Sequence, residues 1–128
     1  MTYSKADLIK YRLDRADETL EEAKILAQTK HWNTVANRLY YACYYVILAF
    51  FAKENMNPST HAGVKTLFNQ QLVKTSRVAI TIGRTYNELF NKRQEGDYAD
   101  FQKFTEEDIS PLIEQTETFI DVIKRLLN

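Results

Sequence analysis

The sequence has few of the residues that interrupt regular structure. Its 128 residues include only three glycines and two prolines, which leaves little room for a turn-rich β architecture. Cys43 is the only cysteine, so no disulfide can form within the chain, as is usual in a reducing cytoplasm. Because Cys43 lies in a hydrophobic run, we expect a buried side chain rather than a reactive thiol.

The sequence also lacks an excess of charge and any recognisable metal motif. Lys plus Arg and Asp plus Glu number 17 each, so no global field attracts nucleic acid or membrane, although a local basic patch is compatible with this balance. Helical bundles hold paired metal ions through Glu-x-x-His motifs, and neither His31 nor His61 has a Glu three residues before it. There is no Cys-x-x-Cys, His-Glu-x-x-His or glycine-rich phosphate loop. We therefore expect neither a metal ion nor a cofactor.

The longest hydrophobic run extends from Leu39 to Ala52, fourteen residues that include four tyrosines. A spanning helix needs roughly 20 apolar residues, and buried tyrosine hydroxyls need hydrogen-bond partners, so we do not expect a membrane segment. A helix that is apolar on all sides must be covered on several of them. The run therefore predicts the central helix of a bundle, and its surplus apolar surface predicts a homodimer. The polar first eighteen residues contain no signal-peptide core, which favours a cytoplasmic location.

Apolar spacings of three and four residues predict helices along most of the chain. Ser4 with Asp7, and Thr105 with Asp108, have the spacing of capping boxes, and Thr60 or Ser59 can cap a short helix after Pro58. The expected helices cover residues 4–29, 32–54, 60–72 and 77–95, with a last one after Thr105. Short connections between long helices imply antiparallel neighbours. Composition and periodicity thus predict an all-α helical bundle with one domain over residues 1–128.

An arginine continues the apolar stripe of the fourth expected helix. Ile82, Tyr86 and Leu89 form the stripe, and the next inward positions are Arg93 and Asp97. An arginine on an apolar stripe is unusual and suggests a structural or functional role. Asp97 can pair with it if the helix continues through the glycine at 96. The alternative is that the helix has left the core by this point and that both side chains are solvated.

Two further polar side chains occupy unexpected places. Arg38 shares a helix face with Tyr41 and Tyr45, and a buried cation must be paired; alternatively, its head reaches water at the rim. His61 falls in the first turn of the short helix, where the positive helix end favours a neutral imidazole. It can take part in catalysis, or it can simply be a polar residue near a cap.

Three segments together resemble the HEPN superfamily, and most closely its small stand-alone branch of uncharacterised, UPF0332-like proteins. They are NRLYYACYYVILAFFAKENMNPSTHAGV (37–64), FNQQLVKTSRV (68–78) and ELFNKRQEGDYADF (88–101). That branch carries a similar tyrosine-rich helix, a Pro-x-Thr-His turn and an Arg-Gln-x-x-Asp-Tyr segment. The resemblance extends from about residue 8 to residue 125.

The resemblance implies a HEPN-like fold, an antiparallel four-helix up-and-down bundle with a short extra helix. Members of the family commonly dimerise, and many are encoded beside a minimal nucleotidyltransferase, often as toxin and antitoxin. Active HEPN ribonucleases cut RNA without metal, and they use an Arg followed four to six residues later by His. Arg93 matches that arginine, but four intervening residues lead to Tyr98, and no histidine follows His61. Tyrosine titrates near pH 10 and is a poor general base at neutral pH, although Tyr98 can donate a hydrogen bond to phosphate.

Three functions remain open from the sequence. The first is a HEPN protein that works with a nucleotidyltransferase and binds RNA or nucleotide phosphate at a site around Arg93, the side chains assigned to it being Arg38, Tyr41, Tyr45, His61, Arg93 and Asp97. The second is a non-catalytic helical module for protein interaction. The third is a metal-independent ribonuclease in which Arg93 acts with Tyr98 or with a displaced His61.

Overall fold

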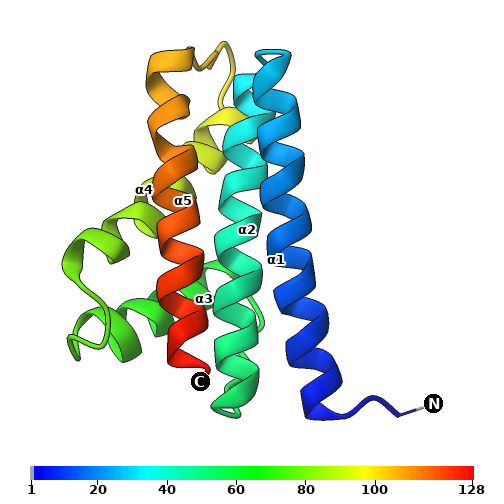
Figure 1. Cartoon of the computed structure of the whole chain (residues 1–128). Helices are drawn as coiled ribbons and strands as arrows, with labels where there is room; N and C mark the ends of the chain where they lie inside the picture. The colour runs from blue at the N-terminus through cyan, green and yellow to red at the C-terminus, as the bar shows by residue number, and fades with distance from the viewer. Residues whose placement is uncertain (1) are drawn as a thin grey trace.

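The computed structural model describes residues 2–128, and this part of the chain is all-helical, without strands (Figure 1). The elements are α1 (Lys5–Gln28), α2 (Trp32–Lys53), α3 (His61–Phe68), a π-helical turn η1 (Asn69–Val73), α4 (Ile80–Tyr98) and α5 (Glu106–Leu126). The long helices α1, α2, α4 and α5 alternate in direction, and α3 is the short extra helix. The predicted up-and-down bundle is thus confirmed.

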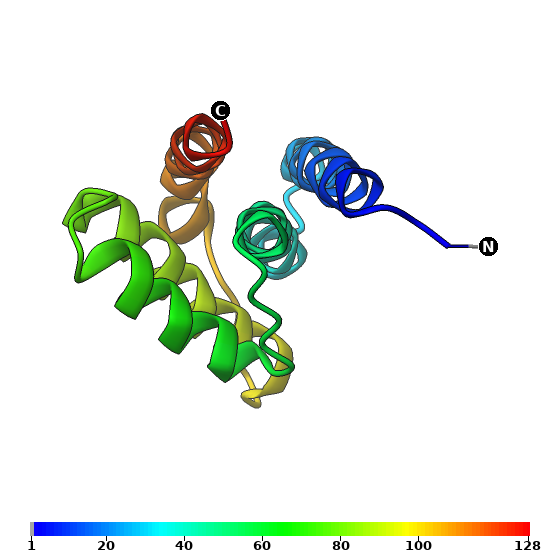
Figure 2. The same cartoon turned by 90° about the horizontal axis from the view of Figure 1, so that it is seen from below.

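Helix α2 lies in the middle of the bundle, as its hydrophobic run predicts. Viewed from below, α1 lies on one side of α2, while α3, α4 and α5 lie on the other (Figure 2). The side chains from Leu39 to Ala52 are buried except for Tyr41, Tyr44, Tyr45 and Leu48, which are half-buried. The helix is long and apolar enough to cross a membrane by length and composition, but 61% of its most apolar window is buried inside the bundle.

Side-chain caps define the starts of three helices. Ser4 and Asp7 form a complete capping box at α1, and Thr105 and Asp108 form another at α5. Thr60 accepts a hydrogen bond from the backbone of Gly63 at the start of α3. Each cap satisfies backbone N–H groups that have no partner within the helix, so the predicted starts are confirmed.

Helix ends are made without glycine. Four non-glycine residues have left-handed backbones just after helical segments: Lys30 (φ 61°), Asn55 (59°), Ser76 (62°) and Phe101 (64°). Glycine usually occupies this position, but all three glycines of this chain lie inside α3 and α4. A Cβ at Gly83 would lie 2.6 Å from Val73, and one at Gly96 would lie 2.9 Å from Phe104. These two glycines therefore allow close packing rather than turns.

The chain between α3 and α4 differs from the prediction. The expected helix over 60–72 leaves α-helical geometry after Phe68 and continues as η1, and α4 begins at Ile80 rather than at 77. Asn69 and Asn87 exchange side-chain hydrogen bonds of 3.1 and 3.0 Å, which join η1 to α4. Val78 is buried, and its N–H donates to the carbonyl of Leu72. Because these contacts hold residues 77–79 outside the helix, α4 starts later than apolar spacing alone suggests.

Candidate functional site

Arg93 lies near the end of α4, and its side chain is only 11% exposed. Its Nη2 donates to the hydroxyls of Tyr41 and Tyr98, each at 3.1 Å. Helix α4 continues through Gly96, so Asp97 faces Arg93, with its Oδ2 3.3 Å from Nε in an ion-pair contact that falls short of hydrogen-bond geometry. Arg93 therefore lies inward and pairs with Asp97, as predicted, whereas Asp97 itself is partly solvated, with 26% of its side chain exposed.

Two arginines flank the ring of Tyr41. The guanidinium carbon of Arg93 lies 5.4 Å from the ring centroid, and that of Arg38 lies 5.3 Å from it. Cation–π contacts of this kind stabilise a guanidinium that has lost part of its hydration. Arg38 is 27% exposed and also meets Glu22 of α1. It therefore combines the two expected roles, because it is partly buried against Tyr41 and paired at the rim.

Asn37 links Arg38 to Asp97, the ion-pair partner of Arg93, and this role was not predicted. Its Oδ1 accepts hydrogen bonds of 3.0 and 2.8 Å from Nε and Nη2 of Arg38. Its Nδ2 donates to Oδ2 of Asp97 at 2.9 Å, across from α2 to the end of α4. In the sequence, only its place beside Arg38, at the polar edge of the hydrophobic run, points to such a role.

His61, at the start of α3, contacts two further tyrosines of α2, Tyr40 and Tyr44. Its Nδ1 lies 2.8 Å from the hydroxyl of Tyr40, and its ring stacks on Tyr44 with a centroid distance of 4.7 Å. Burial, and then the nearby charge of Arg93, lowers the pKa of His61. The expected neutral imidazole therefore fits the structure, with burial and the charge of Arg93 as its causes.

The hydroxyl of Tyr40 and Nδ1 of His61 share one hydrogen bond. Burial raises the pKa of Tyr40 to about 12, so the hydroxyl keeps its proton at neutral pH. A protonated hydroxyl can donate to a bare Nδ1 or accept from a protonated one, so this hydrogen bond suits either tautomer of a neutral His61. Since the Arg93 guanidinium also lies 5.4 Å from the ring of Tyr40, His61 and Arg93 flank the same pair of tyrosines.

Tyr45 lies at the edge of this cluster rather than beside Arg38. Its ring is covered by Arg15 of α1 at 5.1 Å and lies 6.3 Å from the ring of Tyr41. The expected contact of Tyr45 with Arg38 is therefore replaced by one with Arg15, because α1 packs along this face of α2. Cys43 faces the opposite way and is fully buried, and burial raises the pKa of its thiol.

The cluster has the chemistry of a phosphate site. Within residues 2–128, no side chain or backbone group forms a hydrogen bond with Nη1 of Arg93. A guanidinium that is held through Nη2 and by Asp97, with Nη1 left open, can bind phosphate with its planar donors. Residues 2–128 contain no group of three or more His, Cys, Asp or Glu side chains placed to hold a metal ion.

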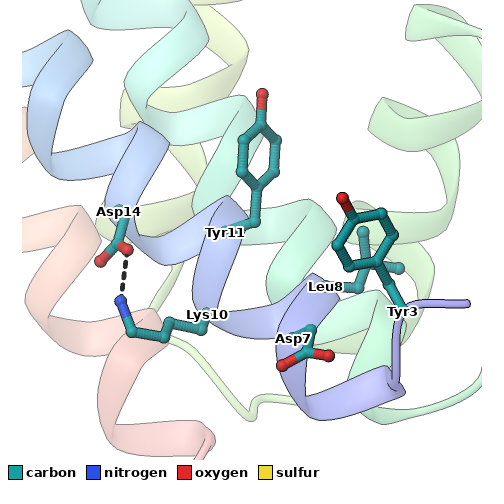
Figure 3. Close-up of a pocket in the computed structure, with 6 residues that line it drawn as sticks. All are labelled: Tyr3, Asp7, Leu8, Lys10, Tyr11 and Asp14. Carbon is teal, nitrogen blue, oxygen red and sulfur yellow. Dashed lines mark hydrogen bonds and ion pairs between the residues drawn. The ribbon is translucent and has the colours of Figure 1, made fainter. Parts of the chain in front are cut away.

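Two other hollows share no residue with the Arg93 cluster. A groove of about 610 Å³ lies along the first turns of α1 (Figure 3), lined by Tyr3, Asp7, Leu8, Lys10, Tyr11 and Asp14. Lys10 and Asp14 pair with each other at its edge. The second lies between α4 and α5, has a volume of about 670 Å³ and includes Arg84, Glu88 and Glu114. Neither brings together an arginine and a histidine as the Arg93 cluster does.

Comparison with known proteins gives consistent matches over most of the chain. Residues 9–126 match the family model described as HEPN domain. The chain is 36% identical over 123 residues to a Thermotoga maritima protein named "UPF0332 protein", covering 96% of this chain and 93% of that protein. It is 34% identical over 115 residues to a Methanocaldococcus jannaschii protein named "Putative toxin MJ0605", covering 90% of this chain and 85% of that protein. A Gloeobacter violaceus protein named "UPF0332 protein glr0978" is 30% identical over 128 residues, with 99% and 98% covered.

Proposed function

The chain belongs to the HEPN domain family, and on that premise we propose that it is the HEPN component of a two-gene, toxin–antitoxin module. Its partner is a minimal nucleotidyltransferase, and it binds RNA or nucleotide phosphate at Arg93. The word toxin in the printed name of the 34% identical relative supports the toxin role. The partner follows from the family resemblance and is the part of the proposal that needs a direct binding test.

The observation that carries the proposal is the way Arg93 is held. Tyr41, Tyr98 and Asp97 fix one edge of its guanidinium, while Nη1 is left without a partner in the described residues. Nη1 is not among the buried side-chain atoms that lack a partner, so it is open to solvent and can be reached from outside. A fixed, partly unpaired guanidinium is suited to an anion that arrives from outside.

A titration of labelled RNA and labelled nucleotides tests the phosphate site. Arg93→Lys keeps the charge but loses the planar fork, so we expect affinity to fall about tenfold, the equivalent of about 1.4 kcal/mol. Arg84→Lys is the matched control, since Arg84 is an exposed arginine of the same helix. Titrations at several salt concentrations separate specific from purely electrostatic binding. Equal affinity of the wild type and Arg93→Lys would show that Arg93 does not bind the phosphate.

A second candidate function, a metal-independent ribonuclease, is favoured by the position of His61. The histidine that the family motif places after the arginine is absent, but His61 and Arg93 both lie within 6 Å of the rings of Tyr40 and Tyr41 (5.8 Å for His61 and 5.4 Å for Arg93). A neutral imidazole with a pKa below its usual value can exchange protons near neutral pH. RNA cleavage in excess chelator that His61→Gln abolishes, while His31→Gln does not, would support this function. If no cleavage occurs, the ribonuclease function is wrong, and only the binding of RNA or nucleotide without catalysis is supported.

The homodimer is also part of the proposal. The half-buried residues Tyr41, Tyr44, Tyr45 and Leu48, here called the tyrosine face, form one stripe on α2. Arg12, Arg15 and Arg38 border the face, and Glu18 and Glu22 pair with two of them. Tyrosine and arginine are enriched in protein interfaces, and charges of both signs allow a face to meet its own copy. If neither RNA, nucleotide nor nucleotidyltransferase binds, an interaction module built on this face is the alternative function.

A further inference from the structure

A polar pocket adjoins Arg93 at the end of α4. It has a volume of about 420 Å³ and is lined by Asn33, Thr34, Asn37, Gly96 and Asp97. One wall is fixed by Asn33, whose Nδ2 donates to the carbonyl of Gln102 at 2.9 Å and whose Oδ1 accepts from the N–H of Phe104 at 2.8 Å. The pocket shares Asp97 with the Arg93 cluster, and Oδ2 of Asp97 lies 3.3 Å from Nε of Arg93, so the pocket and the guanidinium are adjacent.

The pocket still has polar atoms without partners. Oδ2 of Asp97 is occupied, since it accepts from Asn37 and contacts Arg93. Its Oδ1 forms no hydrogen bond with any residue from 2 to 128, and the same holds for the hydroxyl of the exposed Thr34. A ligand in this pocket can therefore donate a hydrogen bond to the carboxylate of Asp97 and exchange a second one with the hydroxyl of Thr34.

The chemistry of the lining selects one part of a nucleotide. A carboxylate repels phosphate, so Asp97 cannot hold the anion itself. Protein sites for unpaired bases usually provide aromatic or arginine planes for stacking, and no aromatic side chain lines this pocket. The group directly attached to a phosphate is the sugar. Carboxylates accept hydrogen bonds from ribose hydroxyls in nucleotide-binding proteins.

We propose that this pocket receives the ribose of the nucleotide whose phosphate lies on Arg93, with Asp97 accepting a hydrogen bond from the 2′-hydroxyl and Thr34 supporting it. The inference rests on the proposed phosphate site and extends it, because the 2′-hydroxyl is the group that distinguishes RNA from DNA. The site is thus selective for ribonucleotides.

Three oligonucleotides of one sequence test this selectivity on the full chain: RNA, DNA and 2′-O-methyl RNA, each with the same 5′ fluorophore. One hydrogen bond to a charged group corresponds to about a tenfold or larger difference in affinity. We expect RNA to bind about tenfold more tightly than DNA, and the 2′-O-methyl form to resemble DNA because it has lost the donor. A mononucleotide and its 2′-deoxy form distinguish a free nucleotide from a polymer as the source of the ribose.

Asp97→Ala separates ribose recognition from a purely structural role. If Asp97 accepts the 2′-hydroxyl, the RNA-to-DNA affinity ratio falls to about one, whereas a side chain that only positions Arg93 lowers both affinities and leaves the ratio unchanged. Thr34→Val is expected to lower the ratio partly, and Thr81→Val, an exposed threonine of α4, is the control. Equal binding of RNA and DNA by the wild type would overturn the ribose inference alone. Failure of the wild type to bind any probe would overturn the proposed function together with it.

Discussion

At the scale of single residues, Tyr41 holds the arginine cluster together. Its hydroxyl accepts a hydrogen bond from Arg93, and its ring centroid lies 5.4 Å from the guanidinium carbon of Arg93 and 5.3 Å from that of Arg38. A guanidinium on a side chain that is only 11% exposed depends on such partners, because an unpaired charge that has lost most of its hydration is costly. The hydroxyl of Tyr41 should therefore contribute to folding stability as well as to the geometry of the site.

Tyr41→Phe removes this acceptor and keeps the ring. We expect the free energy of unfolding to fall by about 1.5–3 kcal/mol, the usual contribution of a hydrogen bond to a charged group. Urea denaturation measures it. Tyr11→Phe is the control, because Tyr11 is 61% exposed, and it should change stability by less than about 0.5 kcal/mol. A similar small change for both variants would mean that the Tyr41 hydroxyl does not stabilise Arg93.

His61 predicts a pH dependence of stability. Burial and Arg93 lower the pKa of His61 in the folded state below its ordinary value of 6.5. Between the two pKa values the unfolded chain binds more protons, so the free energy of unfolding rises with pH across this window. The contribution is complete above pH 6.5 and is lost as the pH falls through 6.5 towards the folded pKa.

Denaturation at a series of pH values, with His61→Asn for comparison, tests this dependence. The variant lacks the titrating group, so its stability should vary less with pH than that of the wild type below about pH 6.5. His31→Asn controls for the other histidine. If His61→Asn and the wild type have parallel profiles, burial of a neutral His61 is not linked to folding.

At the scale of elements, the loop between α4 and α5 contains two phenylalanines with opposite environments. Phe104 is 5% exposed and packs against Gly96 and Lys92, and the loop is held by Asn33. Phe101 is fully exposed and has a left-handed backbone. The loop is therefore fixed by Phe104 and Asn33, and the Phe101 side chain contributes nothing to this anchoring.

Alanine at each position gives a matched pair of variants. Phe104→Ala should reduce the free energy of unfolding by about 3 kcal/mol or more, because it leaves a cavity beside Gly96. Phe101→Ala should leave stability within about 0.5 kcal/mol of the wild type, since its ring loses no buried contact. Thermal unfolding followed by circular dichroism compares the two. A large loss with Phe101→Ala would show that the loop packs differently.

Helix starts and the inward stripe of α4 could be predicted from sequence because they depend on residues close together in the chain. The capping boxes at Ser4 and Thr105 are local patterns, and the position of Arg93 follows from helical spacing. The π-helical turn after Phe68 could not be predicted, because it is held by contacts with α4. The same reason applies to Asn37, whose role depends on how α2 packs against the end of α4.

At the scale of the whole molecule, the tyrosine face is the surface on which the proposed homodimer rests. It leaves four large side chains of the central helix half-buried. The N-terminal groove of Figure 3 is the competing apolar surface, with Tyr3 and Tyr11 largely exposed. The account favours the tyrosine face because it is continuous with the Arg93 cluster through Tyr41.

Light scattering at micromolar concentration should give twice the 15.0 kDa mass of one chain. Tyr45→Glu places a charge on the tyrosine face and should shift the protein towards the monomer, while Tyr11→Glu in the N-terminal groove should not. A wild-type species of 15.0 kDa would contradict the dimer. If Tyr11→Glu dissociates the dimer and Tyr45→Glu does not, the interface is the N-terminal groove rather than the tyrosine face.

The central claim is that the guanidinium of Arg93 is the group that binds phosphate. The most direct measurement follows the side-chain Nε–H signals of all arginines by ¹⁵N NMR while a short RNA is added to the full chain, with assignments from single Arg→Lys variants. We predict that the Arg93 signal shifts saturably with added RNA, because its planar donors contact the phosphate, and that the signal of Arg84 stays in place. Saturable shifts at Arg84 or other surface arginines, with the Arg93 signal unchanged, would contradict the account.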